Sequence, residues 1–170
     1  KLTINCGLIF ATFESMKLLL SLLIGLVTTI SFSQIRFYMG DSTFDSDIAY
    51  TVKNNRVYSG DGVFDNIVIL TLEDNQVFHG NSTSTFDCLF TIKDNKVYRG
   101  SSTFSHDIIY TIDDGKVYRG NSTFSTDCVL TIEENKVYFG DSTFSSDQIF
   151  TIEGDNMLSL AFIACIVGPY

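Results

Sequence analysis

Short runs of apolar residues alternate with polar turns along most of the chain, from about residue 35 to residue 153. The runs are rich in Val, Ile, Tyr, Thr and Phe, a composition typical of β-strands. Several of the polar breaks contain residue pairs that suit the positive φ angles of type I′ hairpin turns. These pairs are Asn54-Asn55, Asp94-Asn95 and Asp114-Gly115. The pattern therefore predicts successive β-hairpins.

The hairpin pattern repeats every twenty residues without a gap. Clear units begin at 51, 71, 91, 111 and 131, a weaker first unit covers 31–50, and the stub TIEG opens a seventh at 151. Three positions are restricted: glycine at 40, 60, 80, 100, 120 and 140, threonine at 51, 71, 91, 111, 131 and 151, and an aromatic residue at 38, 58, 78, 98, 118 and 138. Such self-similarity is the mark of a repeat protein, in which neighbouring units bury one another's apolar faces.

The register within a unit follows from its turn. If the polar pair at 114–115 forms a two-residue turn, Ile112 lies opposite Val117. Strict alternation then places Ile108 on the same face as Ile112, and Ile109 on the opposite face. The recurring glycine is interpreted as a β-bulge or as a close backbone approach where the ribbon bends.

Both faces of this ribbon are partly apolar, so each unit must be covered by its neighbours through coiling, radial closure or stacking. We therefore predict an all-β fold of tandem 20-residue β-hairpin repeats, a coiled or radially closed meander of about six units over residues 34–154. A parallel β-helix solenoid with one coil per unit is the alternative, because it would also stack like residues in ladders. The turn chemistry favours the hairpins.

Residues 155–170 break the repeat and form an apolar C-terminal segment. The pair Asp155-Asn156 is suited to cap a helix that begins at Met157. The apolar stretch before Pro169 is shorter than the about 20 residues that a membrane-spanning helix needs. We expect a buried segment that caps the open end of the array. A partner-docking or membrane-associated tail is the alternative.

The segment 16–33 has the layout of a secretory signal peptide: Met16-Lys17, an apolar run, then small residues before Gln34. Residues 1–15 precede it and are interpreted as an upstream extension outside the mature protein. We expect cleavage near Gln34, contact with a membrane only through the signal peptide before cleavage, and a secreted, periplasmic or cell-surface location. An uncleaved anchor is the alternative.

The chain has 170 residues, of which 45% are hydrophobic and 18% charged. Its 11 basic and 20 acidic residues give a net charge of -9. A protein of this charge is unsuited to bind nucleic acid through phosphate neutralisation, so no nucleic-acid partner is predicted.

Catalytic and metal-binding patterns are not found in the sequence. His79 and His106 occupy different repeat positions without zinc-ligand spacing, and no nucleophile-elbow, zinc-protease or phosphate-loop motif is present. An aspartate recurs after a serine-rich turn and is better explained by a local structural role than by calcium. These aspartates are Asp47, Asp87, Asp107, Asp127 and Asp147. We predict no enzyme, metal or cofactor; an enzyme with a site around 60–68 or 155–170 is the alternative.

Position nine of the unit varies where its neighbours do not. Its residues are Met39, Ser59, His79, Arg99, Arg119 and Phe139. A side chain that the fold leaves free is available to a ligand, and two guanidinium groups one unit apart suit a carboxylate or sulfate. Arg99 and Arg119 are therefore the candidate ligand-binding residues, with an anionic glycan or another cell-surface component as partner. Two solvated surface arginines are the alternative.

Two further sets of side chains suit a flat ligand. The aromatic ladder could stack on sugars, although filling the interface between units is the stronger interpretation because the chain lacks tryptophan. The recurring Ser-Thr pairs could bind ice or a polysaccharide surface, although threonine is also a common strand residue. Cys88 and Cys128 share one repeat position two units apart, beyond disulfide range, and are predicted to be buried thiols.

The repeat T-I-x-x-N-K-V-Y-x-G-x-S-T-F-S-x-D resembles one in small, secreted, uncharacterised bacterial proteins, particularly from the Bacteroidetes. Those proteins carry a signal peptide, several such units and an apolar C-terminal segment. The likeness covers about residues 35–170. It implies a β-rich repeat fold and export, and it implies no activity. The unit at 71–90 departs from the motif, with Ser84 in place of phenylalanine and Phe86 two places later.

Overall fold

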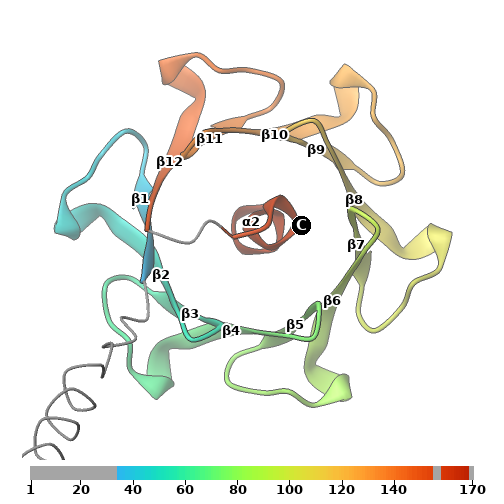
Figure 1. Ribbon diagram of the computed structural model, residues 1–170, viewed down its shortest axis with the longest axis horizontal. Coiled ribbons are helices and arrows are strands. Elements are labelled where there is room, and N and C mark those ends of the chain that lie inside the picture. The colour runs from blue at the N-terminus through green and yellow to red at the C-terminus, as the bar shows by residue number, and fades with distance from the viewer. Residues whose placement is uncertain (1–33, 155–157, 169–170) are drawn as a thin grey trace, which may run out of the picture. The chain divides into compact units, whose positions relative to one another are not determined.

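A computed structural model describes residues 34–154 and 158–168 of the chain. Twelve antiparallel strands form one closed barrel (Figure 1). Each strand pairs with the next one in sequence, and the pairing of the first strand with the last closes the barrel. The strands are β1 (Ile35–Met39), β2 (Ile48–Lys53), β3 (Arg56–Ser59), β4 (Val68–Glu73), β5 (Gln76–His79), β6 (Cys88–Lys93), β7 (Lys96–Arg99), β8 (Ile108–Asp113), β9 (Lys116–Arg119), β10 (Cys128–Glu133), β11 (Lys136–Phe139) and β12 (Gln148–Glu153). The predicted all-β hairpin array is confirmed, and the parallel β-helix is wrong. The segments 1–15 and 16–33 lie outside the described residues.

The three turn pairs that the sequence indicates, 54–55, 94–95 and 114–115, all have positive φ angles and close their hairpins. Both Asn54 (φ 52°) and Asn55 (φ 60°) have the left-handed conformation of a type I′ turn. In the hairpin of β8 and β9, Ile112 lies opposite Val117, as predicted. Asparagine, aspartate and glycine tolerate this conformation better than other residues, which explains their recurrence at the turns.

The pairing between hairpins contains a β-bulge that the sequence did not reveal. Between β7 and β8, Val97 lies opposite Tyr110 and Tyr98 opposite Ile108, so Ile109 is the extra residue. The predicted placement of Ile108 on the face of Ile112 is therefore wrong, because a bulge reverses the alternation beyond it. Ile109 packs instead against the core.

The recurring glycine ends the second strand of each hairpin. The Gly120 amide donates to the carbonyl of Ile109 at 2.6 Å, and the glycine has a φ of 63°. A Cβ atom added to Gly120 would meet no atom within 4 Å, so no close backbone approach requires it. Glycine is needed for its left-handed conformation, at the point where the chain leaves the barrel.

The first and last strands of the barrel together form the sixth hairpin. Strand β1 pairs with β12, with Arg36 opposite Glu153, in the register that the covalent hairpins use. The Thr151 hydroxyl donates to the carbonyl of Gly40 at 2.8 Å, which reproduces the Thr51 to Gly60 bond (2.7 Å) inside the hairpin of β2 and β3. The weak first unit and the stub at 151 are therefore two parts of one unit.

The inner face of the barrel holds the apolar core. The residues at position seven of the units are all fully buried: Phe37, Val57, Val77, Val97, Val117 and Val137. Burial of one such side chain stabilises the fold by about 1.5–3 kcal/mol. Residues at the second and twentieth positions complete this face, among them Ile112, Tyr110 and Leu130.

A short helix, α2 (Leu160–Val167), lies inside the ring of strands (Figure 1). Its buried residues Ala161, Ile163, Ala164, Cys165 and Ile166 belong to the same core as the barrel wall. The N-cap is Ser159, whose hydroxyl accepts from the Phe162 amide, rather than the predicted Asp155-Asn156. The C-terminal segment fills the barrel instead of covering the end of an open array. No helix in the described ranges has the length and apolar character to cross a membrane.

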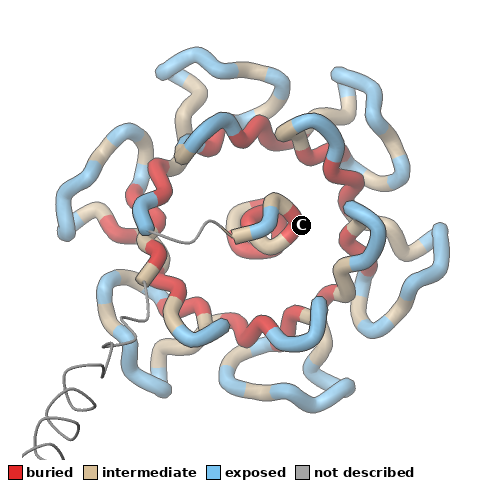
Figure 2. The backbone as a smooth tube through the Cα atoms, in the orientation of Figure 1, coloured by how far each residue is buried: buried red, intermediate tan, exposed pale blue. Residues whose placement is uncertain are grey.

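Six largely exposed outer loops project from the barrel (Figure 2). Each of them carries a 3-10 helix. We define them as residues 40–47, 60–67, 80–87, 100–107, 120–127 and 140–147. The 3-10 helices are η1 (Asp45–Asp47), η2 (Asp65–Ile67), η3 (Thr85–Asp87), η4 (Ser105–Asp107), η5 (Ser125–Asp127) and η6 (Ser145–Asp147). The aromatic ladder lies on the outer face of the wall, where Tyr38 and Tyr118 are 2% and 7% exposed. These aromatics are structural and cannot serve as a sugar-stacking strip.

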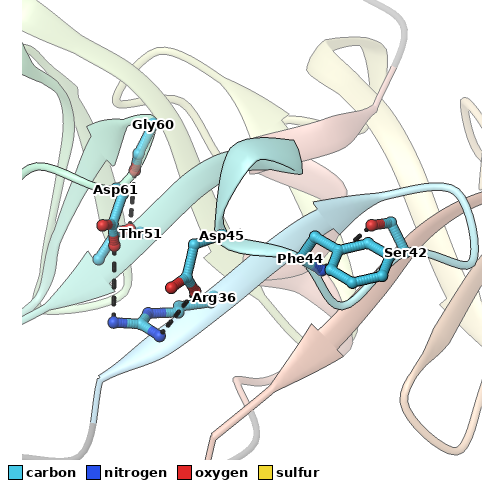
Figure 3. A network of polar contacts seen from close by, with 7 residues as sticks. All are labelled: Arg36, Ser42, Phe44, Asp45, Thr51, Gly60 and Asp61. Carbon is cyan, nitrogen blue, oxygen red and sulfur yellow. Dashed lines mark hydrogen bonds and ion pairs between the residues drawn. The ribbon is translucent and has the colours of Figure 1, made fainter.

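Ion pairs join the outer loops to the strands beside them. Arg36 in β1 lies 3.6 Å from a carboxylate oxygen of Asp45 and 3.5 Å from one of Asp61, so it connects two consecutive loops (Figure 3). Arg56 pairs with Asp65 at 3.1 Å. Two of the four arginines of the chain are thus already committed to internal carboxylates.

Candidate functional site

The position-nine side chains form a ring at one end of the barrel, which we call the rim. Each lies opposite a residue of the inner face: Met39 opposite Phe150, Ser59 opposite Tyr50, His79 opposite Leu70, Arg99 opposite Phe90, Arg119 opposite Tyr110 and Phe139 opposite Leu130. Residues directly opposite one another in antiparallel strands share a face of the sheet. The rim therefore surrounds the mouth of the barrel interior, and all of its residues are exposed.

Arg99 and Arg119 line a single cavity of about 330 Å³ at this end of the barrel. They come from β7 and β9, which are separated by one strand, so their Cα atoms lie about 10 Å apart. The cavity floor includes Ile109 and Tyr110 of β8. The structure thus brings the two predicted ligand-binding residues together around one hollow.

The two rim arginines differ from the other arginines of the chain. Arg36 and Arg56 pair with aspartates of the outer loops, whereas Arg99 and Arg119 form no ion pair with any described residue. Two unpaired guanidinium groups beside one cavity favour an anion, because each can donate two parallel hydrogen bonds to a carboxylate or sulfate.

One carboxylate also lines the cavity, that of Asp107. The hydroxyl of Ser102 donates to it, and the His106 imidazole lies 3.4 Å away. The His106 ring stacks on Phe104 at 5.7 Å between ring centroids. Because Asp107 already accepts this internal hydrogen bond, its repulsion of a bound anion is reduced.

The C-terminal end of α2 approaches the same end of the barrel. A Cβ atom on Gly168 would come within 2.9 Å of the Tyr110 hydroxyl, so the helix end and Tyr110 are in close contact. Burial raises the pKa of Tyr110 to about 12, an effect that Cys165 strengthens and Arg119 opposes. Tyr110 is therefore a neutral, buried floor to the cavity at neutral pH.

The other candidate groups of the sequence do not join this cavity as ligands. His79 lies on the rim beside Arg99, whereas Asp47, Asp87, Asp127 and Asp147 accept hydroxyl hydrogen bonds from serines of their own loops at 2.5–2.6 Å. A calcium ladder is thus unsupported. Within the described part of the chain, no three His, Cys, Asp or Glu side chains lie close enough together to hold a metal ion.

The two cysteines at the shared repeat position lie in β6 and β10. Both are thiols without a bridge, and both are half-buried rather than fully buried as predicted. Four strand spacings separate them along the wall, about 20 Å. Burial raises the pKa of Cys128 despite the nearby Lys116. This thiol is protonated at neutral pH and suited to packing rather than to nucleophilic chemistry.

The two regions named as alternative enzymatic sites, 60–68 and 155–170, contain structural elements of the barrel. Residues 60–67 form an outer loop in which Asp65 pairs with Arg56, and Ile67 packs beside Gly62. Residues 160–167 form the helix inside the barrel. Met39 and Phe139 form the apolar part of the rim. They become neighbours only because β1 pairs with β12, and the sequence alone does not indicate this pairing.

Comparison with known proteins gives one match. A family model described as 6-fold beta flower protein matches residues 37–166. No curated protein and no solved structure matches the chain. The matched range spans the barrel from the second half of β1 to the penultimate residue of α2, so it includes both the rim and the internal helix.

Proposed function

The chain belongs to the 6-fold beta flower family, and on that premise we propose that it is an exported, non-catalytic protein that binds an anionic partner. The binding residues are Arg99 and Arg119. The observation that carries the proposal is that these two exposed arginines line one cavity and form no ion pair with any described residue. The ligand group is a carboxylate or a sulfate, and the partner is an anionic glycan of a cell surface.

Export is supported by the signal-peptide layout of residues 16–33 and by the resemblance of the repeat to that of secreted bacterial proteins. A non-catalytic role is supported by the sequence, which carries no nucleophile-elbow, zinc-protease or phosphate-loop motif. A net charge of -9 disfavours general attraction of anions, so binding has to come from the local arginines.

Binding is tested with a sulfated glycan, dextran sulfate, and a uronate polymer, alginate, with neutral dextran as the uncharged control. The Arg99→Ser/Arg119→Ser variant is expected to lose at least about 10-fold in affinity for both anionic polymers, because hydrogen bonds to charged groups contribute about 1.5–3 kcal/mol each. Calorimetric titration measures the effect. The affinity of the parent protein should also fall as salt screens the charges.

The matched control removes two positive charges from the opposite end of the barrel. The Lys93→Ser/Lys136→Ser variant has the same net charge as the arginine variant, and both lysines are exposed. It should bind like the parent protein. Equal losses in the two variants, or a parent protein that binds neither anionic polymer, would contradict the proposal.

A second candidate function, adsorption to ice or to a crystalline polysaccharide through the Ser-Thr pairs, is less well supported. The serine hydroxyls at these positions already donate to loop aspartates, as Ser122 does to Asp127 at 2.5 Å. Such hydroxyls are occupied by internal hydrogen bonds.

A further inference from the structure

The rim is divided into a cationic and an apolar part. In spatial order its residues are Met39, Ser59, His79, Arg99, Arg119 and Phe139, and the pairing of β1 with β12 brings Phe139 back beside Met39. Arg119 and Phe139 are one unit apart, about 10 Å between Cα atoms. Arg119 thus lies beside the exposed apolar side chain of Phe139, and Met39 follows one unit further around the rim.

Both apolar residues are largely exposed although they sit at the edge of the core. Met39 is 62% and Phe139 63% exposed. Neither position requires an apolar residue, because the equivalent position holds serine in β3 and arginine in β7 and β9. The apolar patch is therefore not explained by folding.

The wall below this part of the rim is apolar and aromatic. Phe37 packs edge-to-face against Tyr50 and Phe150, and the rings of Tyr50 and Phe150 are tilted against each other, with centroids 6.0–6.3 Å apart in all three pairs. Tyr50 and Phe150 remain half-buried, whereas the equivalent Tyr110 and Leu130 are 1% exposed. The backbone of α2 approaches β6, β7, β8 and β9 most closely, so the apolar part of the rim lies away from the helix.

Resting on the function proposed above, we infer that the ligand is an amphipathic anion. Its carboxylate or sulfate lies between Arg99 and Arg119, and an acyl or aryl group attached to it covers Phe139 and extends towards Met39. A purely hydrophilic uronate would occupy the arginines and leave the apolar patch in water. An apolar group about 10 Å long spans the distance from Arg119 to Phe139.

The test compares two sulfate esters that differ only in their apolar part, octyl sulfate below its micelle concentration and methyl sulfate. Each buried methylene adds about 0.8 kcal/mol, about fourfold in affinity, so octyl sulfate should bind the full chain at least about 10-fold more tightly. Titration calorimetry measures octyl sulfate directly and methyl sulfate by competition.

Three variants separate the contributions. Met39→Ser/Phe139→Ser should reduce the affinity for octyl sulfate to that for methyl sulfate and leave methyl sulfate unchanged. Phe124→Ser removes a phenylalanine that is 74% exposed in an outer loop and should change neither affinity. Arg99→Ser/Arg119→Ser should weaken both esters. Because all of these residues are exposed, each variant is expected to fold, which a circular dichroism melt verifies.

The outcomes distinguish this inference from the proposed function. If methyl sulfate binds through the arginines but octyl sulfate gains nothing, the anion site stands and the amphipathic ligand is refuted. If Phe124→Ser weakens octyl sulfate as much as Met39→Ser/Phe139→Ser does, the apolar contact lies elsewhere and the inference also fails. If neither ester depends on the arginines, both proposals fall.

Discussion

At the residue scale, the third and eighth positions of the outer loops change together from one repeat unit to another. Five outer loops hold a serine at the third loop position that donates to an aspartate five residues later. The loop at 60–67 has Gly62 and Ile67 there instead, and a Cβ atom on Gly62 would come within 2.7 Å of the Ile67 side chain. Glycine thus leaves room for the isoleucine side chain, whereas serine supplies the hydroxyl that the aspartate accepts. The two pairs are alternative ways to close the same loop.

This coupling predicts a double-mutant cycle in the loop at 120–127. Ser122→Gly and Asp127→Ile should each destabilise the protein by about 1 kcal/mol, because each leaves one partner without its contact. The double variant recreates the pair found at 62 and 67. Its loss of stability should be smaller than the sum of the two single losses by at least about 0.5 kcal/mol. Urea unfolding measures the three values. Strict additivity of the two losses would show that the positions are independent.

At the element scale, the helix inside the barrel could be expected from the sequence but not placed by it. The apolar run after the last unit and its break from the repeat indicate a buried segment. Its location inside the barrel follows from closure of the barrel, which leaves an interior to fill, and from small residues such as Ala161 and Ala164 that allow a helix to fit. The bulge at Ile109 also escaped prediction, because it depends on pairing between units and not on the turn within one.

Packing of α2 against β8 predicts a stability change in alkali. Burial raises the pKa of Tyr110 from 10.0 to about 12, so the folded protein keeps this proton after the unfolded chain has lost it. The unfolded state therefore binds fewer protons above about pH 10, and stability falls as pH rises towards 12, by about 2–3 kcal/mol in total. Below about pH 10 this contribution is fully present.

The Tyr110→Phe variant isolates this effect. It should show a shallower loss of stability between about pH 10 and pH 12 than the parent protein, whatever its stability at pH 8. Chemical unfolding at several pH values gives both slopes. Tyr98→Phe serves as the matched control, since Tyr98 lies on the outer face of the wall, away from α2. If the slope of Tyr110→Phe equals that of the parent, the phenol is not buried as described.

At the scale of the whole molecule, the sequence predicts the hairpin unit and leaves the number of complete units and their closure open. Each turn and most of the register follow from local chemistry, as at 114–115. The joining of β1 to β12 depends on residues more than a hundred positions apart, and neither half-unit reads as a complete hairpin. For the same reason the candidate arginines were predictable from their varied repeat position, whereas the apolar neighbours Met39 and Phe139 became neighbours only through closure.

Closure of the barrel is the premise of both the rim and its ligand, and an engineered disulfide tests it directly. Arg36 and Glu153 lie opposite each other across the joint between β1 and β12. Cα atoms of such antiparallel partners are about 4.5–5.5 Å apart, within disulfide range. In a parallel β-helix the same residues would be separated by several coils of about 4.8 Å each.

The measurement is peptide mapping of oxidised Arg36→Cys/Glu153→Cys protein under non-reducing conditions, with Arg36→Cys/Glu133→Cys as the control that moves the second cysteine back by one unit. The closed barrel predicts a bridge between positions 36 and 153, and none between 36 and 133. A protein that forms no 36–153 bridge, or that bridges 36 to 133 equally well, would contradict the closed six-hairpin barrel and with it the rim.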